Sequence, residues 1–243
     1  MRGSYYRWTA PGPYTVAFST RLGGVSEGAF SSLNLSELGS DEPERVRENR
    51  ERLCRALEID PSRATMAQQQ HGAVARRAEA VGLRSPGADF PECDAFWSEE
   101  PGLGMMLVTA DCLPIAIVRA GGERPGLALV HAGWRGLLGG VIESVSRALG
   151  PGRTKAAIGP AIGPCCFEVS DELAASFRRR FGRQVASGRK VNLWLAAEKA
   201  LAAAGCSGAE RIELCTSCHP ELFFSYRRDQ GQTGRQGVIG AID

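Results

Sequence analysis

Histidine is scarce in this sequence: the 243 residues include only three, His71, His131 and His219. Imidazole-based acid–base or metal chemistry therefore has few candidates. An excess of charge of one sign is also lacking, because 29 lysines and arginines face 27 acidic residues and leave a net charge of +2. This balance gives no reason to predict a nucleic-acid or membrane partner.

Long hydrophobic runs are missing as well. No apolar stretch approaches the roughly 20 residues that a membrane-spanning helix needs. Residues 1–8 lack the apolar core of a secretory signal. We therefore expect a cytoplasmic protein, in which the eight cysteines are free thiols rather than a disulfide framework.

Strand-like and helix-like segments alternate along the chain without a linker or an internal repeat. This pattern predicts one domain over residues 1–243. Several connections are long, so we expect an α/β or α+β fold, a single-domain layered sandwich of mixed β-sheets flanked by helices. Predicted strands lie at residues 14–20, 104–109, 113–118, 126–130, 156–158 and 212–214, and predicted helices at residues 137–149, 170–181 and 192–204.

Residues 131–136, His-Ala-Gly-Trp-Arg-Gly, follow the apolar run 126–130 and precede a predicted helix. Turns at the carboxyl ends of strands are where α/β proteins often place catalytic groups. Arg135 stands near the start of that helix, where it either binds an anion or pairs with a carboxylate that braces the turn.

A candidate ligand set comprises His71, Cys112 and His131, each at the end of an apolar or strand-like run. Two imidazoles and a thiolate suit Zn²⁺ or copper. Three protein ligands leave a fourth position open, as in catalytic zinc sites. The three residues are far apart and share no local signature, so ordinary core residues remain the alternative.

The segment Cys215-Thr-Ser-Cys218-His219 has the C-x-x-C-H form of a c-type haem attachment site. The lack of an export signal and of an obvious distal ligand loop argues against haem. A structural metal site would need a second pair of ligands, and none is nearby in the sequence. A chance pair of thiols is the remaining interpretation.

Other catalytic signatures are absent from the sequence. The H-x-E element of zinc nucleobase deaminases is missing after both His71 and His131. There is no G-x-S-x-G nucleophile elbow and no phosphate-binding P-loop.

Asn49 and Arg50 lie on or beside the apolar face of a helix that Val46 and Leu53 define. A buried arginine needs an anionic partner. Arg50 is therefore either half of an internal salt bridge or a cation presented to an anionic ligand.

Together, residues 131–136 and the Ala-Asp-Cys-Leu-Pro-Ile segment at 110–115 resemble the laccase-domain family. Its bacterial members are named purine nucleoside phosphorylase, polyphenol oxidase or peptidoglycan editing factor. The resemblance extends over nearly the whole chain and implies a zinc ion held by His71, Cys112 and His131. Further matching segments are residues 19–26, 32–35, 49–50, 70–72, 94–95, 158–162, 223–229 and 233–235. Phe167 and Asn192 depart from the family pattern, which has Tyr and Asp there.

The resemblance implies phosphorolysis of adenosine, inosine or methylthioadenosine to a base and ribose 1-phosphate, together with adenosine deamination. Deamination requires an activated water and a proton carrier, and Asp111 is the best-placed acid by sequence. Its alternative role is a carboxylate that fixes the turn before Cys112. Phosphorolysis requires a cationic pocket rich in donors. The candidate phosphate-binding residues are Arg21, Asn34, Arg50 and Arg135.

Three other functions remain open at this point. A Cys/His₂ set also holds copper, which would suit a polyphenol oxidase, although no further copper centres are evident. An editing hydrolase of peptidoglycan precursors would use Cys112 as nucleophile or a metal-activated water. A non-catalytic binding role is the third. The expected partners are a small-molecule nucleoside and phosphate, for a monomer or weak homo-oligomer.

Overall fold

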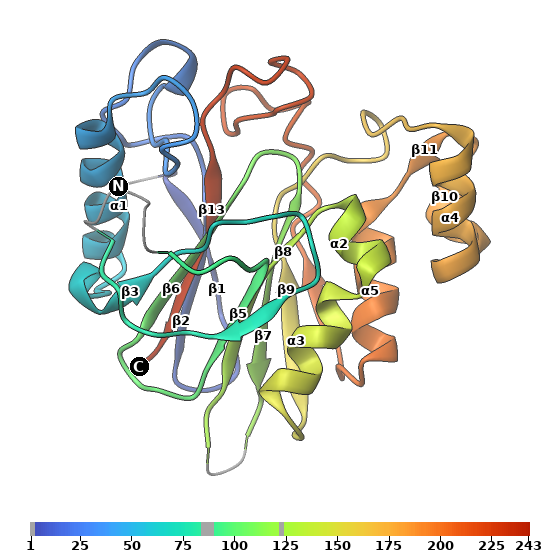
Figure 1. Cartoon of the computed structure of the whole chain (residues 1–243), viewed down its shortest axis with the longest axis horizontal. Helices are drawn as coiled ribbons and strands as arrows, with labels where there is room; N and C mark the ends of the chain where they lie inside the picture. Colours follow the sequence, from blue (N-terminus) through green and yellow to red (C-terminus); the bar gives the residue numbers. More distant parts are fainter. Residues whose placement is uncertain (1–2, 84–89, 122–123) are drawn as a thin grey trace.

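Two large β-sheets packed face to face form the centre of the molecule (Figure 1). A computed structural model of the chain describes residues 3–83, 90–121 and 124–243. In hydrogen-bonded order, the first sheet contains β1 (Tyr5–Trp8), β2 (Tyr14–Ser19), β13 (Gln236–Ile242), β6 (Gly104–Thr109) and β3 (Ala64–Thr65). The second contains β12 (Ala209–Arg211), β9 (Thr154–Ile158), β7 (Leu113–Arg119), β8 (Leu127–Ala132), β5 (Ala95–Ser98) and β4 (Ala75–Arg77).

The space between the sheets is an apolar core. Phe18 and Leu107 of the first sheet belong to the same buried cluster as Ala116 and Leu129 of the second. Successive strand residues point to opposite faces, so Ile115, next to Ala116, packs toward the helices instead. Because β7 and β8 are covered on both faces, their sequences are continuous apolar runs.

Helices cover the outer faces of both sheets, as Figure 1 shows. On the first sheet, α1 (Pro43–Ala56) packs Leu53 in a cluster with Met106 and Ile239. The second sheet is covered by α2 (Trp134–Gly139), α3 (Val141–Leu149), α4 (Asp171–Phe181) and α5 (Leu193–Ala203). The remaining short elements are β10 (Ala186–Ser187), β11 (Lys190–Val191) and 3₁₀ turns at Gly28–Phe30, Pro61–Arg63 and Arg183–Val185. These layers confirm the predicted mixed α/β sandwich.

Two predicted elements were wrong. The single helix expected over residues 137–149 is divided into α2 and α3 at Gly140, whose φ of 86° is left-handed. The strand expected at residues 212–214 lies earlier, as β12, where it pairs in parallel with β9. Apolar spacing indicated the buried face that α2 and α3 share, but backbone geometry set the boundaries of the elements in both cases.

The two later helices begin as predicted. The Ser170 side chain accepts a hydrogen bond from the Leu173 N–H at 3.3 Å, and that of Asn192 accepts one from the Leu195 N–H at 3.0 Å. Both are N-cap interactions that satisfy a free N–H of the first turn.

Each helix in the described ranges is too short or too polar to cross a lipid bilayer.

Candidate metal centre and active site

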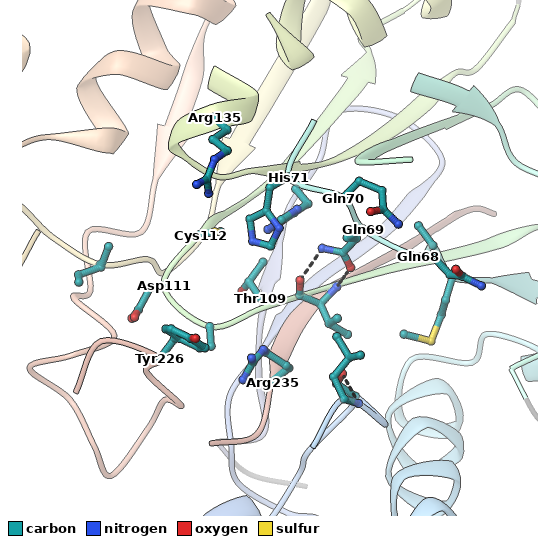
Figure 2. A pocket seen from close by; sticks show the side chains of 18 of the residues that line it. Gln68, Gln69, Gln70, His71, Thr109, Asp111, Cys112, Arg135, Tyr226 and Arg235 are labelled. Carbon is teal, nitrogen blue, oxygen red and sulfur yellow. Dashed lines mark hydrogen bonds between the residues drawn. The ribbon is translucent and has the colours of Figure 1, made fainter. Parts of the chain in front are cut away.

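The structure brings His71, Cys112 and His131 together. Their ligand atoms lie within 4.8 Å of one another. Strand register explains part of this arrangement. Pro114 of β7 pairs with His131 of β8, so Cys112, two residues before Pro114, lies at the same end of these strands. His71 lies in the loop before β4 and points to the same end of the strands (Figure 2). Its ring contacts that of His131 edge-on, with the ring centroids 4.8 Å apart.

Asp94, the residue directly before β5, holds both His71 and His131 in position. Its buried carboxylate accepts hydrogen bonds from the backbone N–H groups of Gln70, His71 and Gly72, at 3.2, 2.9 and 2.7 Å. It also lies 2.8 Å from Nδ1 of His131. His131 therefore presents Nε2 toward Cys112, because its other ring nitrogen is occupied. Sequence reasoning missed this role, since Asp94 appeared only within a family segment.

The three side chains also influence one another electrostatically. Burial alone would raise the pKa of the Cys112 thiol, but the charges and hydrogen bonds of His131 and His71 lower it to about 6. Burial opposes the charged form of His131, yet Cys112 and Asp94 raise its pKa to about 9. The arrangement therefore favours a thiolate at Cys112, the form of cysteine that binds metals.

Left-handed backbone at two non-glycine residues gives the site its shape. His71 has a φ of 58° and Asp111 a φ of 85°. Such conformations cost about 1–3 kcal/mol and persist only where surrounding bonds hold them. The Asp94 carboxylate holds His71 in this conformation by accepting a hydrogen bond from the His71 backbone N–H. The Asp111 carboxylate accepts hydrogen bonds from the Thr216 hydroxyl at 2.6 Å and the Arg227 backbone N–H at 2.7 Å.

Two glycines allow the backbone after β8 to pass close to Cys112 and to the loop that carries His71. A Cβ at Gly133 would lie 3.0 Å from Cys112 Sγ, and one at Gly136 would lie 2.8 Å from the Gly72 carbonyl oxygen. A side chain at Gly136 would push the start of α2 away from the Gly72 carbonyl, and one at Gly133 would crowd the Cys112 sulfur.

The three side chains line a cavity of about 880 Å³. This volume is in the range of small-molecule sites. Aromatic side chains in its wall are Phe90, Trp134, Phe167 and Tyr226, and the cationic ones are Arg50, Arg135, Arg227 and Arg235. Figure 2 shows Arg135 and Arg235 on opposite sides of His71 and Cys112.

Arg135 stacks on Trp134, with its guanidinium carbon 4.2 Å from the ring centroid. Within the described residues it has no carboxylate partner. Of the two roles expected for it, the geometry favours the cation that binds an anion.

Arg235 is a cavity residue that sequence reasoning did not single out. Its guanidinium donates to the Thr233 and Gly234 carbonyl oxygens at 2.8 and 3.0 Å. Burial lowers its pKa, and the nearby charges of Cys112 and Asp111 oppose that shift. A partly desolvated arginine beside the thiolate is well placed to receive an anionic substrate.

Arg50 forms an internal salt bridge and also lies at the cavity, so both of the alternatives expected for it are present. Its Nε donates to the Leu35 carbonyl oxygen at 2.9 Å, and its Nη1 forms a 2.9 Å ion pair with Glu37. It nevertheless lines the cavity. The internal salt bridge is therefore present, and it holds this cation at the cavity wall.

Arg21 and Asn34 lie outside the residues that line the cavity. Arg21 donates to the Ser31 and Pro220 carbonyl oxygens at 2.7 and 2.9 Å. The side-chain oxygen of Asn34 accepts from the Arg235 N–H at 2.8 Å. Both residues hold loops in place, so the geometry gives no support to the phosphate-binding role expected of them.

Comparisons with known proteins give a consistent picture. The family model described as multi-copper polyphenol oxidoreductase laccase matches residues 15–242. A protein named purine nucleoside phosphorylase from Pseudomonas aeruginosa is 37% identical over 238 residues, covering 94% of this chain and 93% of the relative. Purine nucleoside phosphorylase YfiH from Escherichia coli is 37% identical, with 94% of each chain covered. The crystal structure of YlmD from Geobacillus stearothermophilus superposes with a TM-score of 0.90 at 32% identity, covering 100% of this chain and 97% of that one.

Proposed function

This chain belongs to the multi-copper polyphenol oxidoreductase laccase family, and from that premise we propose that it is a zinc-dependent purine nucleoside phosphorylase. One observation carries the proposal: two imidazoles and a thiolate meet within 4.8 Å in a cavity that also presents arginines. The names of the relatives from Pseudomonas aeruginosa and Escherichia coli support the same activity.

The donor set fits zinc. His71, Cys112 and His131 would hold the ion, and Asp94 already fixes the tautomer that leaves Nε2 of His131 available. When bound, zinc would supply Lewis-acid polarisation of a substrate atom.

In phosphorolysis, a phosphate oxygen bonds to C1′ of the ribose while the bond from C1′ to the purine nitrogen breaks. The electron pair of that bond leaves with the purine, which then gains a proton. Arg135 and Arg235 would bind the phosphate and orient it. The aromatic rings of Trp134, Phe167 and Tyr226 offer apolar faces for the base.

Asp111 takes a positioning role in this proposal. Thr216 and Arg227 each donate to one of its carboxylate oxygens, which ties the turn before Cys112 to the segment 216–227. This is the turn-fixing alternative recognised in the sequence, and it keeps the Cys112 thiolate facing the cavity.

The purified protein is expected to release hypoxanthine from inosine only when phosphate is present, with ribose 1-phosphate as the second product. Chromatography of reactions with and without phosphate, alongside elemental analysis, measures this directly. Bound zinc without base release would leave the metal site standing and overturn the phosphorylase assignment. With adenosine, adenine reports phosphorolysis and inosine reports deamination.

A copper-dependent phenol oxidase is the competing function, because the family description names copper. Reduction of dioxygen to water needs several copper centres, yet the other donor cluster among the described residues consists of cysteines alone. Oxidation of phenols by the copper-loaded protein, with no activity of the zinc-loaded protein on inosine, would favour the oxidase.

Replacing Arg235 with glutamine is expected to raise the KM for phosphate by about 10- to 100-fold, because a charge-assisted hydrogen bond contributes about 1.5–3 kcal/mol. The KM for inosine should change much less. Steady-state kinetics with each substrate varied in turn separates the two effects. Arg211→Gln is the matched control, since Arg211 pairs with Glu198 and Glu213 outside the cavity.

A further inference from the structure

Four cysteines form a second cluster that the proposed reaction does not use. The sulfur atoms of Cys165, Cys166, Cys215 and Cys218 all lie within 4.8 Å of one another. The sequence suggested that the Cys215–Cys218 pair lacked partner ligands, and the folded chain supplies them from the turn after β9. We propose that these four thiols bind a second, structural zinc ion.

The sulfur spacing fits a tetrahedral ion. Zinc–sulfur bonds of about 2.3 Å place the sulfurs of a tetrahedral site about 3.8 Å apart. Cys218 Sγ lies 3.6 Å from Cys165 Sγ and 3.5 Å from Cys166 Sγ. All four residues are free cysteines, and Cys165 and Cys218 are exposed, so an ion can enter from solvent.

The surrounding backbone is arranged for thiolates. The Gly163 N–H donates to Cys215 Sγ at 3.2 Å, an interaction that stabilises negative charge on sulfur. A Cβ at Gly163 would lie 3.2 Å from both Cys165 Sγ and the Cβ of Cys215, so glycine permits the two turns to approach. The Arg227 guanidinium donates to the Cys166 carbonyl oxygen at 3.3 Å and brings a positive charge beside the cluster.

The position of the cluster suggests what the ion stabilises. It joins the turn that carries Phe167 to the turn that carries Thr216. Phe167 lines the cavity, and the Thr216 hydroxyl holds Asp111 beside Cys112. A zinc ion here would therefore fix one wall of the candidate active site from outside, without contacting substrate.

Metal counting tests the proposal independently of phosphorolysis. Protein purified with reductant and without chelator should contain two zinc ions per chain. Cys112→Ser should retain one, and the double variant Cys165→Ser with Cys218→Ser should also lose one. The matched control is Cys206→Ser, because the Cys206 thiol donates to the carbonyl oxygens of Thr154 and Gly208 and belongs to neither donor cluster. Equal zinc content in the double variant and the wild type would overturn the site.

Cobalt substitution gives a second measurement if the double variant fails to fold. In Cys112→Ser, any intense thiolate-to-cobalt charge-transfer absorption must arise from the four-cysteine cluster, and it should weaken further in Cys112→Ser with Cys218→Ser. Absence of this absorption would refute the proposal. The wild type can also be denatured with a chelator present and alkylated without reduction. All eight cysteines should then be modified. Protection of two or more of the four cluster cysteines, located by peptide mass mapping, would identify a disulfide there and overturn the metal site.

Discussion

Replacing His131 with alanine is expected to remove the proposed catalytic zinc and to slow phosphorolysis by about 10³-fold, or roughly 4 kcal/mol of transition-state stabilisation. His131 is 3% exposed and lies between Asp94 and Cys112. Alanine would delete one of three ligands and leave the Asp94 carboxylate without its imidazole partner. Elemental analysis and initial rates with inosine and phosphate measure the two losses.

His219→Ala is the matched control, since it replaces the histidine that pairs with Glu221 outside the cavity. It should keep both the metal and the rate. If His131→Ala retained full activity with bound zinc, the ligand assignment would be wrong. Retention of both proposed zinc ions with a lost rate would instead show that His131 acts on substrate rather than on the ion.

The layers of the fold were predictable because both sheets are covered by packed elements. Burial on two faces makes β7 and β8 continuous apolar runs, which are recognisable without any knowledge of their partners. Helix starts at Ser170 and Asn192 follow from local capping chemistry. The break at Gly140 was not predictable from apolar spacing, because α2 and α3 continue the same buried pattern on either side of it.

Sequence reasoning singled out candidate site residues of rare types and overlooked those whose roles depend on long-range contacts. With only three histidines in the chain, His71 and His131 were few enough to be singled out and matched to family segments. Cys165 and Cys218 are separated by 53 positions, so their proximity is a property of the fold. The same holds for Asp94 and Arg235, whose roles depend on neighbours brought in by strand pairing and loop packing.

Replacing Asp94 with asparagine should weaken both the fold and the metal site. The carboxylate accepts backbone hydrogen bonds on both oxygens, so the amide nitrogen of asparagine would face an N–H donor whichever way it is turned. Leaving such buried donors unsatisfied costs about 1–3 kcal/mol each, and we expect the free energy of unfolding to fall by about 2–4 kcal/mol. Loss of the partner that orients His131 should also reduce zinc affinity by about 10- to 100-fold.

Two measurements separate these effects. Urea denaturation in the presence of chelator reports the stability of the metal-free fold, and competition with a chromophoric chelator reports zinc affinity. Asp171→Asn is the matched control, because Asp171 is exposed in the first turn of α4 and its substitution should cost about 0.3–1 kcal/mol at most. Lower stability with unchanged zinc affinity would mean that Asp94 only braces the His71 loop. Lower affinity beyond what the stability loss explains would identify it as the residue that positions His131 for the metal.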